Sequence, residues 1–384
     1  MDIRKAALEL HSKLKGKISV LPKIAIRDRG DLSLVYTPGV AEPCREIAVD
    51  RELAYSYTMK GNCIAVVSDG SAVLGLGDIG PEAALPVMEG KCVLFRQLAG
   101  IDAFPLCLAA HDADSIVSTV KAIAPVFGAI NLEDIAAPKC FEVEKRLLDI
   151  GIPVMHDDQH GTAVVVLAGL INALKVTGKD KKCRIVINGA GAAGIATARL
   201  LLKYGFYDLA LADSQGAIYK GRPGLTPEKK DMAELTNRRG IKGSIHELAE
   251  GADVLIGLSR PATITAADIR KMNSPIVFAM ANPIPEIMPD EAREGGAAVI
   301  GSGRSDFPNQ INNSLTFPGI FRGALDVRAL AINDAMKIAA AEAIAGLVTK
   351  PTAQMVVPEP LDPGIVPAVA EAVRKAARDT GVAK

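Results

Sequence analysis

The sequence has no excess of charge of either sign. Its 384 residues include 44 lysines and arginines and 44 aspartates and glutamates, so the formal net charge is +0. A chain without net charge has no long-range field that would attract nucleic acid or an anionic membrane surface. We therefore expect neither of these partners.

Long apolar segments are also lacking. The longest apolar run, "AVVVLAGLINAL" at 163–174, is well short of the roughly 20 residues that a membrane helix needs. Residues 1–20 mix charged residues with leucines at helical spacing and contain no apolar core typical of a secretory signal. We expect a cytoplasmic protein without a membrane span.

Closely spaced cysteine pairs are missing too. The six cysteines are scattered along the chain, and no two of them form a C-x-x-C motif. This spacing argues against a zinc ribbon and against a disulfide framework. We expect reduced thiols.

What the sequence does contain is a pattern of alternating strands and helices. Its content of 49% hydrophobic and 23% charged residues is typical of compact domains, and its length suggests about two domains of roughly 150 residues each. Strand-like runs occur at 63–68, 102–110, 125–132, 183–188, 208–213, 252–259, 274–282 and 297–303. We predict an α/β fold with two domains, because such alternation favours parallel sheets covered by helices. An N-terminal α/β catalytic domain would span 1–155 and a C-terminal Rossmann-type domain 156–384.

One glycine motif has the full context of a dinucleotide-binding site. In "NGAGAAG", Gly189, Gly191 and Gly194 follow a strand-like run and precede an alanine-rich helical segment. These glycines allow a tight turn, close approach of a pyrophosphate and close packing of helix on strand. Asp213 ends the next strand-like run, where an acceptor for a ribose hydroxyl is expected.

A second G-x-G-x-x-G, formed by Gly75, Gly77 and Gly80, lacks this context. Pro81 and Pro86 follow it closely, and prolines interrupt helices. We interpret 63–76 as a β-hairpin with Asp69-Gly70 at its turn. The glycines would then form a loop, either for flexibility or for close approach of a ligand.

Two acidic pairs follow strand-like runs. Glu133 and Asp134 occur in "INLEDIAAP", and Asp157 and Asp158 occur in "VMHDDQHGTA", where we expect a helix to start near Gly161. Ligands bind at the carboxyl ends of strands in such sheets, and an all-oxygen cluster suits Mg²⁺ or Mn²⁺. The alternative is helix capping by one aspartate and a solvated surface pair at 133–134.

Single residues near these motifs leave alternatives open. His156 and His160 have the i, i+4 spacing of a zinc pair, but we interpret each as a hydrogen-bonded structural residue. Lys91 lies within the apolar stripe of a predicted helix, so desolvation should lower its pKa and make it a usable base; the alternative is a lysine that reaches solvent. Tyr36 precedes a Thr-Pro-Gly turn and suits either a cleft or a half-buried position.

Seven motifs together resemble the malic enzyme family in its short prokaryotic form. In chain order they are "YTPGVAEPC", "LGLGDIGPEAALPVMEGK", "NLEDIAAPKC", "DDQHGTA", "NGAGAAG", "ANPIPE" and "NNSLTFPG". The resemblance covers most of the chain. It implies oxidative decarboxylation of L-malate to pyruvate and CO₂ with reduction of NAD(P).

The resemblance also implies a role for each matching residue. Lys91 would be the general base, Tyr36 the general acid that protonates C3 of enolpyruvate, and Asp157 the hydrogen-bond partner of Lys91. A divalent cation would bind Glu133, Asp134 and Asp158. The dinucleotide would contact Gly189, Gly191, Ala192, Ala193, Gly194, Asp213, Ser214, Thr162 and Asn282, and the substrate would contact Asn282 and Asn313. A homodimer or larger assembly is implied, in which the tyrosine segment reaches the partner's site.

Three questions stay open at this level. Larger family members have an arginine for a malate carboxylate where this chain has Ala72, so another donor is needed. Asp213 would repel a 2′-phosphate and favours NAD, but Lys220 and Arg222 are near in sequence and leave NADP open. Alternative functions are decarboxylation of oxaloacetate, conversion of malate to lactate without net NADH release, and a non-catalytic dinucleotide sensor.

Overall fold

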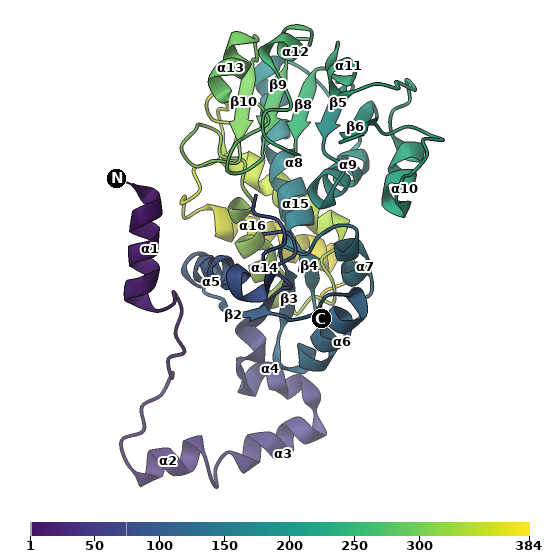
Figure 1. The fold of residues 1–384 in the computed structure, drawn as a ribbon. Helices are drawn as coiled ribbons and strands as arrows, with labels where there is room; N and C mark the ends of the chain where they lie inside the picture. The colour runs from purple at the N-terminus through teal and green to yellow at the C-terminus, as the bar shows by residue number, and fades with distance from the viewer. Residues whose placement is uncertain (1, 74) are drawn as a thin grey trace.

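The structure, a computed structural model, describes residues 2–73 and 75–384. It contains two α/β units, each built on its own sheet, which lie one above the other in Figure 1. The chain leaves the first sheet after His156, one residue beyond the predicted domain limit at 155.

The first sheet has four strands in the order β2-β1-β3-β4, and all neighbours run parallel. Its strands are β1 (Cys63–Ser68), β2 (Asp102–Cys107), β3 (Ala129–Leu132) and β4 (Val154–His156). Its connecting helices are α5 (Gly80–Ala99), α6 (Ala113–Ile123) and α7 (Lys139–Lys145). The strand order reverses at β1, so the loops after β1 and β3 lie at the edge where ligands bind in such sheets.

The predicted hairpin over 63–76 is wrong. β1 pairs in parallel with both β2 and β3, and all six of its residues are buried. The chain then leaves the sheet in a loop in which Ile79 and Gly80 donate N–H bonds to the Gly70 carbonyl. An apolar run of this length fits a buried parallel strand as well as a hairpin strand, so its pattern did not separate the two.

The expectation that two prolines would prevent a helix after Gly80 is also wrong. Pro81 lies in the first turn of α5, where its missing N–H leaves no bond unmade. Pro86 lies inside the helix and has no N–H to donate to the carbonyl of Glu82. Both residues are exposed, so water can donate to that carbonyl instead. α5 therefore continues and carries Lys91 on its buried face.

The second sheet has the order β10-β9-β8-β5-β6-β7 and is parallel except for β7. Its strands are β5 (Ile185–Asn188), β6 (Leu209–Asp213), β7 (Gly216–Ala217), β8 (Val254–Gly257), β9 (Ile276–Ala279) and β10 (Val299–Ser302). Its helices are α9 (Ala192–Tyr204), α10 (Pro227–Leu235), α11 (Ile245–Ala249), α12 (Ala266–Arg270) and α13 (Pro289–Glu294). The order reverses at β5, which places the Gly189 loop at the switch point of a Rossmann-type sheet.

Four further helices connect the two units. These are α8 (Asp157–Thr177), α14 (Phe317–Asp326), α15 (Asp334–Leu347) and α16 (Ile365–Asp379). α8 is long and apolar enough to resemble a membrane span, but 67% of its apolar window is buried in the fold, where it packs on α9 and α15. α14 returns to the first unit, and its Phe317 packs edge-on against Phe95 of α5 with ring centroids 4.6 Å apart.

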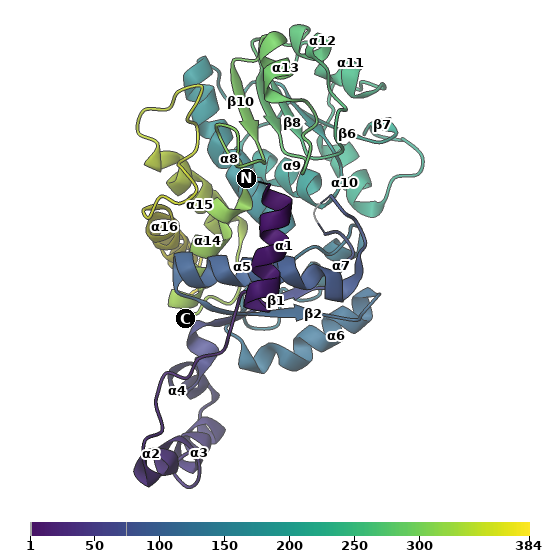
Figure 2. The same cartoon turned by 60° about the vertical axis from the view of Figure 1, so that its left-hand side comes forward.

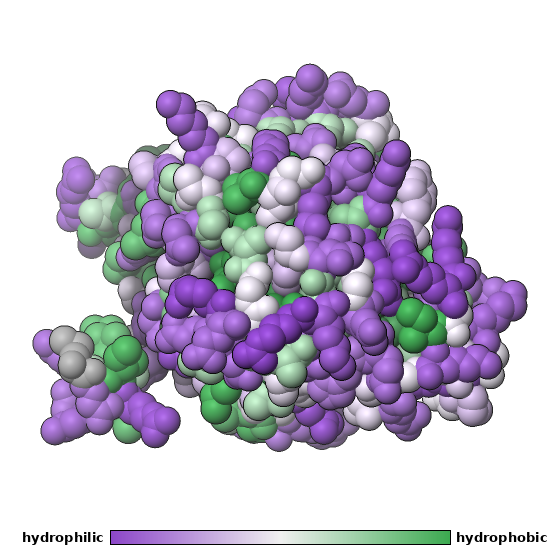
Figure 3. All heavy atoms as spheres, turned by 90° about the horizontal axis from the view of Figure 1, so that it is seen from above, coloured by the Kyte–Doolittle hydropathy of each residue, from purple (hydrophilic) through white to green (hydrophobic). Residues whose placement is uncertain are grey.

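The N-terminal residues form an arm with little contact to the body. Its helices are α1 (Ile3–Leu14), α2 (Arg29–Val35), α3 (Ala41–Val49) and α4 (Ala54–Tyr57). α1, α2 and α3 have no buried residue, and Figures 1 and 2 show α2 and α3 extending below the body. Figure 3 shows α1 standing apart with hydrophobic side chains on its surface. Large apolar residues such as Ile3, Val20 and Val49 are 79–90% exposed.

Candidate active site

Five charged side chains meet at the carboxyl edge of the first sheet. Glu133 and Asp134 follow β3, whereas Asp157 and Asp158 form the first turn of α8 directly after β4. Because β3 and β4 are parallel neighbours, the two acidic pairs lie side by side. Lys91 joins them from α5.

The Lys91 ammonium is held inside this acidic cluster. Its Nζ lies 2.6 Å from Asp157 Oδ2 and 2.9 Å from Glu133 Oε1, and 4.1 Å from the centre of the Phe317 ring. The side chain is 8% exposed and that of Asp157 is fully buried. Lys91 does not reach out to solvent, which was the alternative that its position in the sequence left open.

The pKa of Lys91 differs from the sequence-based expectation. Burial does lower it, but the charges of Asp157 and Glu133 raise it more, so that the pKa of Lys91 in the metal-free chain lies above its usual value. A pattern of apolar neighbours indicated the burial of Lys91 and gave no information on the two carboxylates. The ammonium is therefore the stable form in the cluster without a cation.

Three of the carboxylates have the arrangement of a cation site. Oxygen atoms of Glu133, Asp134 and Asp158 lie within 4.8 Å of one another. Burial raises the pKa of Glu133, and it raises that of Asp158 to about 6, because these carboxylates lose hydration and face other negative charges. A set of oxygen donors that repel one another fits a hard divalent cation such as Mg²⁺ or Mn²⁺.

The backbone at Asp134 is shaped for this arrangement. Asp134 has φ of 52°, a left-handed conformation that is uncommon outside glycine. Its N–H donates to Asp158 Oδ2 at 2.7 Å, so that the loop after β3 is joined to the first turn of α8. Residues in such conformations are maintained by surrounding contacts and are frequent at functional sites.

α8 begins earlier than the sequence indicated. It starts at Asp157 and not near Gly161, and His156 occupies the N-cap without a side-chain capping bond. Asp157 and Asp158 are thus first-turn residues, where the helix dipole stabilises negative charge. The structure excludes the capping role that was the alternative for these aspartates.

The two histidines lie behind the cluster and do not form a zinc pair. His160 Nε2 lies 2.9 Å from Glu144 Oε2, and the backbone N–H of His156 donates to Glu144 Oε1 at 2.8 Å. Burial lowers the pKa of both imidazoles. Burial also acts to raise the pKa of Glu144, but its hydrogen bond and electrostatic interaction with His160, together with the charge of Lys337, outweigh this effect and hold the pKa at about 2. Glu144 on α7 therefore fixes the chain on both sides of Asp157 and Asp158.

The glycine loop after β1 contacts the acidic loop through one backbone bond and one side-chain bond. The N–H of Ala72 donates to the carbonyl of Asp134 at 2.9 Å, and Ser71 Oγ accepts from the N–H of Ala136 at 2.9 Å. Gly75 lies against the backbone of Asn282, where a Cβ atom would come within 2.5 Å of the carbonyl oxygen. Close approach of the Asn282 backbone thus explains Gly75, whereas the two interpretations that we left open for these glycines were flexibility and close approach of a ligand.

Tyr36 is not part of this cluster within one chain. It is 67% exposed and ends α2 in the arm. The arm joins the body through α4, which leads to the amino end of β1, whereas Lys91 and its carboxylates lie at the carboxyl ends of the strands. The predicted acid and base therefore come from opposite edges of the sheet.

Asn282 and Asn313 belong to the second unit. Asn313 precedes α14, and its carbonyl accepts a bond from Thr316 Oγ1, which also lies 3.4 Å from the carbonyl oxygen of Gly161 on α8. Asn282 follows β9 and is exposed. Thr162 lies on α8 next to Gly161, and neither Thr162 nor the asparagines are among the residues that line the cavity described next.

A cavity of about 880 Å³ opens at the carboxyl ends of β5 and β6. Gly189, Gly191, Asp213 and Ser214 line it, as do Ala137 and Pro138 from the loop after β3. Gly194 lies beneath it, where a Cβ atom would come within 1.9 Å of the Gly189 carbonyl oxygen. Ala192 and Ala193 begin α9, so that the first turn of this helix faces the glycine loop.

The whole chain matches known proteins. Two family models fit it: "Malic enzyme, N-terminal domain" over residues 15–148 and "Malic enzyme, NAD binding domain" over residues 159–378. The chain belongs to the malic enzyme family. The two-domain malic enzyme fold agrees with the predicted α/β architecture.

Relatives of the chain span nearly its full length. The bifunctional malic/malolactic enzyme of Bacillus subtilis is 57% identical over 390 residues, which cover 100% of this chain and 95% of the relative. The NAD-dependent malic enzyme of Geobacillus stearothermophilus is 54% identical, with 96% and 78% covered. The crystal structure of malic enzyme from Pyrococcus horikoshii has a TM-score of 0.96 at 50% identity, with 100% and 92% covered. Other relatives are named NADP-dependent malic enzymes.

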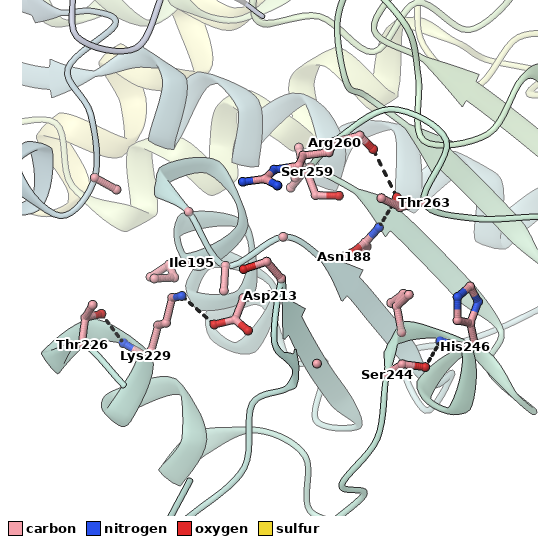
Figure 4. Close-up of a pocket in the computed structure, with 18 of the residues that line it drawn as sticks. Asn188, Ile195, Asp213, Thr226, Lys229, Ser244, His246, Ser259, Arg260 and Thr263 are labelled. Carbon is pink, nitrogen blue, oxygen red and sulfur yellow. Dashed lines mark hydrogen bonds and ion pairs between the residues drawn. The ribbon is translucent and has the colours of Figure 1, made fainter. Parts of the chain in front are cut away.

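Several residues at the site of this malic enzyme were not found from the sequence. The sequence pattern did not indicate a role for Glu144, because its hydrogen-bond partners lie 12 and 16 residues away on other elements. Lys229, Arg260 and Thr263 line the dinucleotide cavity from α10 and from the loop after β8 (Figure 4). Only the position of Arg260 directly after a strand-like run could have indicated it.

The first turn of α8 provides a test of the cluster geometry. At Gly161 a Cβ atom would come within 1.9 Å of Asp157 Oδ1, so Gly161→Ala must displace the carboxylate that holds Lys91. We expect kcat with malate to fall about 100-fold, the effect of a displacement near 1 Å in a catalytic group. Steady-state kinetics and a thermal melt would measure the loss of activity and the retention of the fold.

A matched control is Gly346→Ala in α15, because a Cβ atom at this exposed helical position meets nothing within 4 Å. It should leave kcat unchanged. Full activity in Gly161→Ala would contradict the proposed geometry.

Proposed function

We propose that this malic enzyme catalyses the oxidative decarboxylation of L-malate to pyruvate and CO₂ with reduction of NAD(P), and that it requires Mg²⁺ or Mn²⁺. The observation that carries the proposal is a buried lysine, Lys91, held by Asp157 at 2.6 Å beside three carboxylates that fit a cation. The loop that follows Glu133 and Asp134 also lines the dinucleotide cavity. A substrate at the carboxylates would therefore lie next to a cofactor in the cavity.

The chain's own residues account for the proton transfers of this reaction. Lys91 would accept the proton of the C2 hydroxyl as a neutral amine, the form that a divalent cation beside it would favour over the ammonium, and its contact with Asp157 fixes its direction. Phe317 covers the ammonium and keeps water from it. Tyr36 donates a proton to C3 after CO₂ has left, and the amides of Asn282 and Asn313 bind the substrate or the nicotinamide side. When bound, the nicotinamide accepts the hydride from C2 and the cation withdraws electrons from the substrate oxygens.

One observation favours a second function at the same site. The relative that is 57% identical is named a bifunctional malic/malolactic enzyme. Conversion of malate to lactate would use the same residues, with the hydride returned to the product while the nicotinamide stays bound. The two functions differ in whether reduced cofactor leaves the enzyme.

The first prediction concerns the products. With L-malate, Mn²⁺ and NAD or NADP, we expect pyruvate and reduced cofactor in equal amounts, measured by absorbance and by product analysis. Lys91→Ala should lose this turnover and retain cofactor binding, because the glycine loop that binds the cofactor lies on the other sheet. Lactate without net reduced cofactor would favour the second function, and unchanged turnover in Lys91→Ala would remove Lys91 from the mechanism.

The second prediction concerns the cation. Glu133→Gln should bind Mn²⁺ at least about tenfold more weakly, because it removes one anionic ligand from the three-carboxylate set. Electron paramagnetic resonance of free Mn²⁺ measures this binding without substrate turnover. Glu142→Gln makes the same change at an exposed position on α7 and should bind Mn²⁺ normally. Full activity of Glu133→Gln in the presence of a chelator would rule out a catalytic cation.

We further propose that the enzyme acts as a homodimer in which the arm of one protomer completes the partner's site. The arm has no buried residue in α1, α2 or α3, yet it carries many exposed large apolar side chains. Exposed apolar surface of this extent is typical of an interface. A Tyr36 supplied by the partner would resolve its separation from Lys91 in the single chain.

The third prediction tests this exchange by complementation. Tyr36→Phe and Lys91→Ala should each be nearly inactive, whereas a mixture refolded or co-expressed together should recover about one quarter of the wild-type sites, as expected for random symmetric dimers. The double variant carrying both changes is the control and should stay inactive. No recovery in the mixture would show that Tyr36 acts within its own protomer or not at all.

A further inference from the structure

Glu286 is a buried carboxylate that the proton transfers described above do not use. It ends the motif "ANPIPE" in the loop after β9 and is 1% exposed. A buried carboxylate is costly unless a cation or hydrogen-bond donors compensate its charge. Burial raises the pKa of Glu286, and the largest interactions that oppose this rise come from backbone N–H groups and not from a cation. The position of Glu286 is therefore set by the backbone around it.

The two oxygens of Glu286 accept bonds from two different loops. Oε1 accepts from the N–H of Ser259 at 2.7 Å, in the loop after β8. Oε2 accepts from the N–H of Ala281 at 3.0 Å, directly before Asn282. The backbone carbonyl of Glu286 also accepts from the N–H of Ile264 at 3.1 Å. One side chain thus joins the loop after β8 to the loop after β9.

Gly257, the last residue of β8, makes room for this carboxylate. A Cβ atom at this position would come within 2.5 Å of Glu286 Cδ. Glycine within a strand often marks a place where another group approaches closely. Here the absence of a side chain lets the carboxylate lie against the end of β8.

The two loops that Glu286 joins serve different parts of the proposed reaction. Ser259, Arg260 and Thr263 of the loop after β8 line the dinucleotide cavity, as Figure 4 shows. The loop after β9 carries Asn282, whose carbonyl oxygen would lie 2.5 Å from a Cβ atom at Gly75 in the first unit. The loop after β9 therefore packs against the unit that carries the acidic cluster, and Glu286 connects it to the cofactor cavity.

We propose that Glu286 is a positioning residue that fixes Asn282 relative to the dinucleotide, so that malate and the nicotinamide are aligned for hydride transfer. Glu286 does not line the cavity and acts through the N–H of Ala281. A carboxylate suits this role because both contacts are N–H donors, whereas an amide has only one acceptor oxygen. The inference rests on the proposed function, which places Asn282 on the substrate or nicotinamide side.

The test begins with Glu286→Gln, which keeps the volume of the side chain and leaves one of the two N–H groups without an acceptor. We expect kcat with malate to fall about tenfold or more, because a small displacement of a group that aligns the reactants slows the reaction steeply. The dissociation constant of NAD, measured by calorimetry, should change by less than about threefold, since the glycine loop keeps its contacts. A thermal melt checks that the variant is folded.

A double-mutant cycle with Asn282→Ala separates positioning from a merely structural role. Asn282→Ala lowers kcat by itself, and adding Glu286→Gln should then lower it by less than about twofold, because the residue that Glu286 positions is already gone. A merely structural role would lower kcat by the same factor in both backgrounds.

Two further variants complete the design. Gly257→Ala displaces the same carboxylate without removing it and should also lower kcat, which keeps the test available if Glu286→Gln does not fold. Glu294→Gln is the matched control, because Glu294 is exposed at the end of α13, and it should have the kcat of the wild type.

The outcomes distinguish this inference from the proposed function. Wild-type kcat in folded Glu286→Gln, or equal loss in both backgrounds of the cycle, would overturn the role of Glu286 and leave the proposed function standing. Wild-type kcat in Asn282→Ala would remove Asn282 from the site and this inference with it. A wild-type protein that does not oxidise malate would overturn the proposed function itself.

Discussion

The burial of charge at the carboxyl edge of the first sheet is the constraint on which the rest of the structure depends. Four carboxylates lie there against one ammonium, and isolated buried charges cost several kcal/mol each. Lys91 offsets two of the carboxylates by direct contact, and the first turn of α8 stabilises the aspartates through its dipole. The remaining negative charge is what makes the cluster suited to a divalent cation.

The surrounding elements are arranged to keep this cluster in place. α5 continues past two prolines and so brings Lys91 to the carboxylates, while Glu144 on α7 holds the chain on either side of the aspartate pair. α14 returns from the second unit to place Phe317 over the ammonium. The site is therefore built from both units and from helices far apart in the chain. This arrangement places the acidic cluster next to the unit that holds the dinucleotide cavity.

The same principle operates at the other end of the dinucleotide cavity. The buried carboxylate of Asp213 forms ion pairs with Arg222 and Lys229. The three side chains together carry a net positive charge, whereas the aspartate alone would be negative. Which ligands a buried acidic residue accepts thus depends on its partners as much as on its own charge.

The sequence predicted the strands well, since each strand-like run contains an observed strand. It also identified the dinucleotide motif, because the glycines of "NGAGAAG" are required by local backbone geometry. It failed where an element's neighbours decide the outcome. The run at 63–68 became a central parallel strand and not a hairpin arm, and Pro86 was tolerated inside α5 because it faces solvent. The local sequence pattern does not indicate which strands will pair with a segment or which side of a helix will face solvent.

By itself, the sequence determined the family, the two-domain α/β architecture and the kinds of side chain available for catalysis, because these follow from local patterns and from residue chemistry. The tertiary structure alone decided the charge states and the partners. The pKa of Lys91 lies above its usual value because Asp157, 66 residues away, contacts it. Tyr36 lies away from Lys91 because the arm extends from the opposite edge of the sheet. Electrostatic interactions act through distance in space, and only folding sets that distance.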